Sequence, residues 1–259
     1  MRKINTTFQT SDAFKNWLKK AKTARTKALR EGPAHVFQPR IWKELKEQLI
    51  KANFGKCMYC EFQGIPADYY AAEHFRPKAE VTNDRCRVVH DGYYWLAYEW
   101  QNILLACTKC NSAHPDGEMG SHPGKANEFP ISKTRVLAPG PDPDKWIDDL
   151  VAEEPLLLHP YFDKAEDHFS LGKFGTLEGI TKRGKATIKI CDLNRPSLRE
   201  ARERSHREVL TKFAETLQSY LNGNSLAGVW YGEKDQFSTY LNCFLMNYFE
   251  KVLHSKPAV

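Results

Sequence analysis

The sequence has no apolar run approaching the roughly 20 residues that a membrane-spanning helix needs. Its first stretch, MRKINTTFQTSDAFKNWLKK, contains basic residues but lacks the apolar segment of a signal peptide. We also find no internal repeat, no low-complexity segment and no phosphate-binding P-loop. These absences predict a cytoplasmic protein, in which any nucleotide sensing would come from another chain.

Cysteine is scarce, with seven residues in 259, yet four of the seven form two Cys-x-x-Cys pairs. The pairs are Cys57 with Cys60 and Cys107 with Cys110. One such pair could be redox-active or half of a zinc site, but two pairs in a reducing compartment favour a metal over disulfides. Four thiolates make a closed tetrahedral zinc site, which is structural rather than catalytic. The other cysteines are isolated and are interpreted as ordinary thiols: Cys86, Cys191 and Cys243.

The charge of the chain is uneven. The net charge is +6, but residues 1–56 contain 14 Lys and Arg against 4 Asp and Glu, which is +10 and leaves −4 for the rest. A basic end on a near-neutral body suits a nucleic-acid partner, and it equally suits a solvated helix face. With 41% hydrophobic and 12% aromatic residues, the chain is long enough for one large or two modest globular domains.

Helix signals occur towards both ends of the chain. An N-cap at Ser11 and a stop at Gly32-Pro33 predict one amphipathic helix, and Pro39 opens a second that closes at Phe54-Gly55. Arg195-Pro196 predicts the start of a long helix to about Leu221, and a last helix is expected over about 234–253. The apolar stripe of that last helix is interpreted as core rather than a partner groove: Phe237, Tyr240, Leu241, Phe244, Leu245 and Tyr248.

The middle of the chain differs from its ends in composition. Residues 57–131 are rich in Cys, His and aromatic residues, the turn-rich stretch 138–146 marks a soft boundary, and residues 153–190 are expected to form short strands and turns. We therefore predict an α+β, mainly helical fold with three parts. These are a basic helical region (1–56), a zinc-stapled core (57–137), and a mixed, then helical, C-terminal region (138–259).

The dipeptide Glu73-His74 lies between the two cysteine pairs, in the extended-looking stretch YYAAEHFRP. Neighbouring residues of a strand point to opposite sides, so this Glu and His can have separate roles. Asn102 precedes the apolar stretch ILLAC, and Asn111 directly follows the second cysteine pair. A lone Glu-His pair is usually an ordinary surface feature, but its place between two zinc knuckles favours a functional site.

This arrangement resembles the HNH, or ββα-metal, nuclease motif in its zinc-stapled form. The resemblance implies that His74 is the general base and that Glu73 and Asn111 hold one catalytic Mg²⁺ or Mn²⁺. It also implies that Asn102 pins the loop that orients His74. His114, three residues after Asn111, is a candidate third ligand or phosphate contact. Many members of the family carry Asp or His where this chain has Glu73.

Several cations surround this motif. Arg76 and Lys78 follow the proposed base, and Lys109 and Lys125 flank the second cysteine pair. We predict that these four bind phosphates beside the scissile bond, with Arg76 favoured because its planar guanidinium matches a phosphate. For Lys109 and Lys125, ordinary solvated charges are an equally good interpretation. His90 and His122 are interpreted as surface residues.

The resemblance extends over roughly residues 50–205, through the strings YYWLAYEWQNILLACTKCN, EEPLLLHPYFD and KRGKATIKICDLNRPSLREAR. These look like the nuclease subunit of Septu-type anti-phage systems and related retron-associated HNH proteins. That family implies an endonuclease, with DNA as the favoured target, in complex with an ATPase subunit. Two alternatives stay open: an effector that cleaves RNA such as tRNA, and a non-catalytic zinc-knuckle module that binds nucleic acid.

Overall fold

The computed structural model describes residues 6–113, 124–142, 145–222, 237–238 and 241. Among these residues, helices are more extensive than strands, and the strands form three separate two-stranded antiparallel sheets, β1–β4, β2–β3 and β5–β6. The α-helices are α1 (Asp12–Glu31), α2 (Pro39–Ala52), α3 (Thr108–Asn111), α4 (Trp146–Val151), α5 (Lys182–Ile190) and α6 (Pro196–Leu221). The strands are β1 (Tyr70–His74), β2 (Val81–Thr82), β3 (Val88–His90), β4 (Ile103–Cys107), β5 (Phe169–Leu171) and β6 (Leu177–Gly179). Short 3₁₀ helices include η4 (Tyr94–Leu96) and η5 (Trp100–Asn102). The predicted mixture of helices and strands is confirmed.

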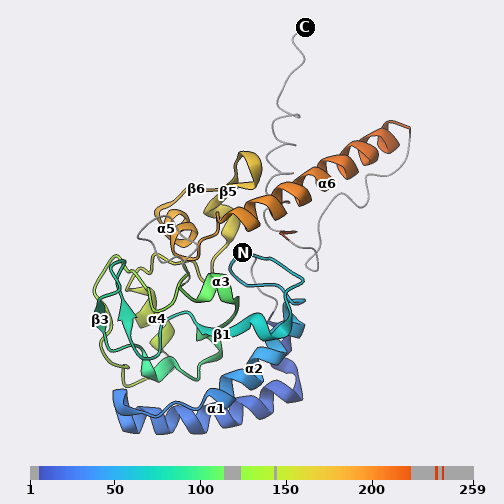
Figure 1. Ribbon diagram of the computed structural model, residues 1–259. Helices are drawn as coiled ribbons and strands as arrows, with labels where there is room; N and C mark the ends of the chain where they lie inside the picture. The colour runs from blue at the N-terminus through green and yellow to red at the C-terminus, as the bar shows by residue number, and fades with distance from the viewer. Residues whose placement is uncertain (1–5, 114–123, 143–144, 223–236, 239–240, 242–259) are drawn as a thin grey trace.

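Helices α1 and α2 lie side by side along one side of the molecule, on the opposite side from α6 (Figure 1). The Ser11 hydroxyl accepts a hydrogen bond from the Phe14 amide and begins α1, and Gly32 ends it with φ +65°. The buried Trp17 indole donates a hydrogen bond of 2.7 Å to the Ile41 carbonyl and ties the two helices together. Both helices therefore match the sequence prediction.

Strands β1 and β4 form an antiparallel pair at the centre of the molecule, which we call the β1–β4 hairpin. Strands β2 and β3 lie in the connection between them. Tyr70 pairs with Cys107 and His74 with Ile103, and every residue of β4 is buried. Helix α3 follows β4 directly, so that the paired strands β1 and β4 and a short helix meet at the second cysteine pair. The first pair is joined to the same strand by a 2.8 Å hydrogen bond from the Met58 amide to the Leu105 carbonyl.

The C-terminal region differs from its prediction at one place. Residues 182–190 form helix α5 rather than strands and turns, because the Thr181 hydroxyl accepts from the Gly184 amide and caps a new helix. Gly184 lets this helix approach the preceding segment, since a Cβ there would lie 2.2 Å from the His168 carbonyl oxygen. The β-branched residues of KRGKATIKI suggested strand, but a cap and close packing outweigh that local preference.

Helix α6 begins and ends where the sequence predicted, at Pro196 and Leu221. For the predicted last helix, the structure describes only Phe237, Ser238 and Leu241, all buried. The remaining residues of its apolar stripe lie outside the described residues. Within the described part of the chain, no helix combines the length and the apolar character needed to cross a membrane.

Candidate metal centres and active site

The four paired cysteines meet in one buried cluster. Their sulfur atoms all lie within 4.8 Å of one another, and the Sγ atoms of Cys60 and Cys107 are 3.9 Å apart. A tetrahedral zinc ion with bonds of about 2.3 Å requires sulfur atoms about 3.8 Å apart. Burial raises the pKa of the Cys57 and Cys110 thiols, so a bound cation is needed for all four to be thiolates. The number, spacing and chemistry of the donors fit a structural metal ion, as the sequence predicted.

Arg195 covers this cluster, and sequence analysis did not identify it. Its guanidinium group donates to the sulfur atoms of Cys110 at 3.4 Å, Cys107 at 3.7 Å and Cys60 at 3.8 Å. Four thiolates around one divalent ion carry a net charge of −2, which a guanidinium partly neutralises. Because Arg195 immediately precedes α6, it also ties that helix to the cysteine cluster.

The β1–β4 hairpin places the predicted catalytic dipeptide at the end of β1. Glu73 pairs with Leu104 and His74 with Ile103, and their exposed fractions are 8% and 5%. The strand is undistorted there, so the two side chains leave it in different directions. This is the difference in side-chain direction that the sequence suggested.

The His74 ring is held by one nitrogen. Its Nε2 lies 3.0 Å from the Ala97 carbonyl oxygen and must carry the hydrogen of that bond, which leaves Nδ1 as the basic nitrogen. No described residue forms a hydrogen bond with Nδ1, and the Trp42 ring packs edge-on at 5.0 Å. Burial, together with the nearby Lys78 ammonium, lowers the pKa of His74 to about 3. The imidazole is therefore neutral near pH 7, as a general base must be.

Glu73 is already paired. The Lys125 ammonium lies 2.5 Å from Glu73 Oε1 and 3.0 Å from the His74 carbonyl oxygen, and Lys125 is fully buried. Burial raises the pKa of the Glu73 carboxyl, and the Lys125 ammonium opposes that shift. The structure thus places Lys125 inside the site rather than on the solvent-exposed surface predicted for a phosphate contact.

Asn102 holds the chain just beyond His74. Its Oδ1 accepts from the Arg76 amide at 2.8 Å, and its Nδ2 donates to the Arg76 carbonyl at 3.0 Å and to the Leu96 carbonyl at 3.2 Å. The Asn102 carbonyl accepts from the Phe75 amide at 2.9 Å. One buried amide therefore fixes both sides of residue 76 and joins it to the turn that positions Ala97.

Asn111 ends α3 with an unsatisfied acceptor. Among the described residues, its buried Oδ1 has no hydrogen-bond partner, and its Nδ2 reaches the Ser112 hydroxyl at 3.5 Å. An orphaned amide oxygen is an available ligand for a hard cation. The donor types of Glu73 and Asn111 therefore fit Mg²⁺ or Mn²⁺, although the Glu73 carboxylate is paired with the Lys125 ammonium. His114, the candidate third ligand, and His122 lie outside the described residues.

The three other predicted phosphate contacts differ in their burial. Arg76 is buried, with its Nε 3.1 Å from Glu153 Oε2 and its Nη2 2.8 Å from the Leu150 carbonyl, so its fork is engaged within the protein. Lys78 is half-buried, with Nζ 5.2 Å from the Trp42 ring centroid and 5.7 Å from that of Phe37. Lys109 is exposed on α3. This geometry argues against Arg76 as a surface phosphate contact and favours Lys78.

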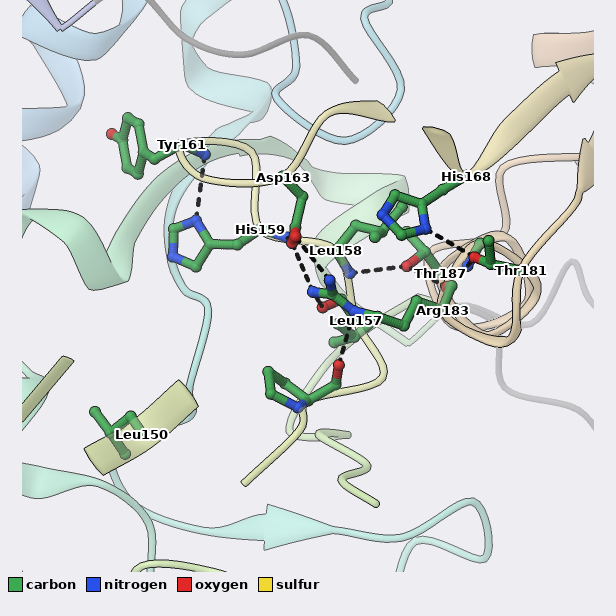
Figure 2. A network of polar contacts seen from close by, with 12 residues as sticks. Leu150, Leu157, Leu158, His159, Tyr161, Asp163, His168, Thr181, Arg183 and Thr187 are labelled. Atoms are coloured by element: carbon green, nitrogen blue, oxygen red, sulfur yellow. Dashed lines mark hydrogen bonds and ion pairs between the residues drawn. The ribbon is translucent and has the colours of Figure 1, made fainter. Parts of the chain in front are cut away.

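A second polar network, shown in Figure 2, holds the segment that contains His159 and was not anticipated from the sequence. Arg183 of α5 binds both carboxylate oxygens of Asp163, at 2.7 and 2.6 Å, and the carbonyl groups of Pro155 and Leu157 at 3.0 Å. These bonds fix a segment whose His159 ring lies 4.2 Å from the Phe75 ring. Through His159, helix α5 thereby supports Phe75, the residue that follows His74.

A cavity of about 450 Å³ borders the same segment. Its walls include Arg76, Asn102, His159 and Phe162 but neither Glu73 nor His74. The predicted site is therefore separate from this cavity. The two share the loop at residues 75–76, which Asn102 holds.

These features define a mixed α/β protein with a cysteine-stapled hairpin-and-helix core. No protein-family model matches the chain. It is 31% identical over 219 residues to a Septu protein PtuB of Bacillus mycoides (strain KBAB4), covering 83% of this chain and 67% of that protein. It is 25% identical over 157 residues to a Septu protein PtuB of Bacillus thuringiensis, of which it covers 43%. The chain belongs to the Septu PtuB family.

The chain also matches a Septu protein PtuA of Bacillus mycoides (strain KBAB4). The two are 33% identical over 170 residues, which cover 63% of this chain but 21% of that protein. A segment similar to this chain is therefore part of a much longer polypeptide there.

Proposed function

We propose that this protein is a metal-dependent HNH endonuclease that hydrolyses phosphodiester bonds of DNA, as the effector subunit of an anti-phage complex. The observation that carries the proposal is His74, whose ring is oriented by the Ala97 carbonyl and whose Nδ1 has no described partner. It stands beside a carboxylate, on a hairpin stapled by four cysteines. A fixed, neutral imidazole is suited to accept a proton from an attacking water.

His74 would act as the base through Nδ1, because Nε2 is committed to the Ala97 carbonyl. A pKa of about 3 makes the free imidazole a weak base. An anionic phosphodiester beside the ring would stabilise the imidazolium and raise that pKa. Asn102 would keep the geometry constant through its bonds to Arg76, and Lys78 would contact a neighbouring phosphate.

Glu73 and Asn111 would hold the catalytic divalent ion. When bound, such an ion supplies charge neutralisation of the phosphate and of the leaving oxygen. The orphaned Asn111 oxygen supports this role, since a buried acceptor without a partner is costly unless a ligand satisfies it. The cysteine cluster would hold a structural Zn²⁺ and take no part in the reaction.

Plasmid cleavage with Mg²⁺ or Mn²⁺ tests the proposal. His74→Ala should reduce the rate by about 10²–10⁴-fold, the usual contribution of a general base, with zinc content and fold unchanged. His90→Asn, at a histidine of β3 outside the site, is the matched control and should keep the wild-type rate. Equal rates for His74→Ala and wild type would refute the assignment. Cleavage of tRNA but not plasmid would assign RNA as the target, and binding of nucleic acid without cleavage would indicate a non-catalytic module.

We further propose an ATPase subunit as the partner. The similarity to one segment of a long PtuA chain supports this, because modules that are fused in one protein commonly associate as separate chains in another. A nuclease without a visible specificity element also needs restraint by a partner. Co-expression with the neighbouring gene product should yield a stable complex. A protein that purifies alone and cleaves at full rate would contradict this.

A further inference from the structure

Lys125 occupies the place beside Glu73 where the proposed function requires a metal ion. Its ammonium group lies 2.5 Å from Glu73 Oε1, 3.0 Å from the His74 carbonyl oxygen and 3.4 Å from its neighbour's carbonyl at Ala126. The side chain is fully buried. A buried cation surrounded by oxygen atoms reproduces the ligand environment that Mg²⁺ and Mn²⁺ prefer.

A divalent ion and the Lys125 ammonium would compete for this carboxylate oxygen. A bound Mg²⁺ would lie about 2.1 Å from its ligand, and the ammonium already lies 2.5 Å from the same atom. Two cations bound to one carboxylate oxygen would lie only about 4 Å apart, where like charges repel in a buried site. A metal ion that binds Glu73 Oε1 therefore weakens the hold of this carboxylate on the Lys125 ammonium and favours its departure.

The backbone of Lys125 is anchored, so that a movement would involve its side chain. The Lys125 amide donates to the Cys110 carbonyl at 2.9 Å, and the Ala126 amide to the Asn111 carbonyl at 2.6 Å. The preceding Gly124 has φ +105°, and a Cβ there would lie 2.0 Å from the Ser112 carbonyl oxygen. These contacts hold the backbone of the lysine against the end of α3, the helix that carries Asn111.

We propose that Lys125 is a resident counter-ion of the catalytic site, and that a divalent ion binds Glu73 and Asn111 by displacing its ammonium group. This proposal rests on the proposed function. Lys125 is a positioning residue that holds and orients the Glu73 side chain before the metal arrives. Once displaced, its ammonium stays tethered beside the site, where it would meet the phosphate of a bound nucleic acid.

The first experiment measures metal binding without using nuclease activity. Mn²⁺ is titrated into the full-length, zinc-loaded protein and followed by electron paramagnetic resonance. Lys125→Met should bind Mn²⁺ at least 10-fold more tightly than wild type, because the competing cation is gone. Lys78→Met, which removes a nearby cation that does not contact Glu73, should change the affinity less than about 3-fold. A Lys125→Met protein that binds no more tightly than wild type would overturn the proposal.

The second experiment uses the wild-type chain, in case Lys125→Met does not fold with Glu73 unpaired. Lysine acetylation by an amine-reactive ester is mapped by mass spectrometry with and without saturating Mg²⁺. Lys125 should be protected in the absence of Mg²⁺ and react at least 5-fold faster in its presence, whereas Lys78 should react equally in both. Unchanged protection of Lys125 while Mn²⁺ or Mg²⁺ is bound would overturn the proposal. An inactive protein that still exchanges lysine for metal would refute the proposed function alone.

Discussion

The cysteine cluster and the Glu73–His74 region lie on the same hairpin, yet they use their polar atoms in opposite ways. The cluster gathers four equivalent sulfur donors within 4.8 Å and places the Arg195 guanidinium over them. In the Glu73–His74 region, the Asn111 side-chain oxygen and one His74 nitrogen have no hydrogen-bond partner among the described residues, and a buried lysine pairs with the Glu73 carboxylate. A saturated set of donors stabilises a fold, whereas an unsaturated set can bind and release ligands.

The largest effect is expected from breaking the saturated cluster. Cys57→Ser or Cys110→Ser should give zinc-free protein that is unfolded or insoluble, because a structural zinc site can contribute on the order of 10 kcal/mol to folding. Cys86→Ser, at an exposed cysteine outside the cluster, should fold and retain one zinc per chain. Metal analysis and circular dichroism would check both variants. Soluble, folded Cys110→Ser protein without zinc would contradict the prediction.

A smaller effect is expected when the cluster keeps its ligands but loses its covering charge. Arg195→Gln should weaken zinc binding by about 10–100-fold, since groups that bond to metal ligands contribute on that scale. Competition with a chromogenic chelator would measure the change. Arg204→Gln, at an exposed arginine of α6, is the control and should bind zinc as wild type does. Equal affinity for Arg195→Gln and wild type would show that the guanidinium contributes only packing.

The last expected effect is a pH dependence of stability that comes from His159, a buried histidine in the segment that Arg183 holds. Burial lowers the pKa of His159 to about 3, against about 6.5 in an unfolded chain. Below pH 6.5 the unfolded chain binds a proton that the folded protein does not, so stability is lost as the pH falls. Between pH 7 and pH 5 this amounts to about 2 kcal/mol.

His159→Asn keeps an acceptor for the Tyr161 amide, which now donates to His159 Nδ1 at 3.2 Å. Because asparagine does not titrate, this variant should lose about 2 kcal/mol less stability than wild type between pH 7 and pH 5. Urea unfolding at the two pH values would measure the difference. An identical loss in both proteins would mean that His159 titrates normally in the folded state.

Local signals in the sequence were sufficient for the elements that depend on neighbouring residues. Ser11 and Gly32 predicted the limits of α1, and Pro196 predicted the start of α6, because caps and proline act within one helical turn. Helix α5 was missed because its β-branched residues favour strand, and its cap at Thr181 was overlooked. The spacing of the four cysteines correctly predicted a common metal cluster.

The partners of the charged side chains were decided by tertiary structure. Lys125 and Glu73 are 52 residues apart, Arg76 and Glu153 are 77 apart, and Arg195 and Cys110 are 85 apart. The sequence by itself determined which chemical groups are present, two thiol pairs and a Glu-His dipeptide, because spacing and residue type are local properties. It could not determine which cations face solvent and which are buried against a carboxylate. A buried charge must find an oppositely charged partner, and only the packing of distant segments brings that partner within reach.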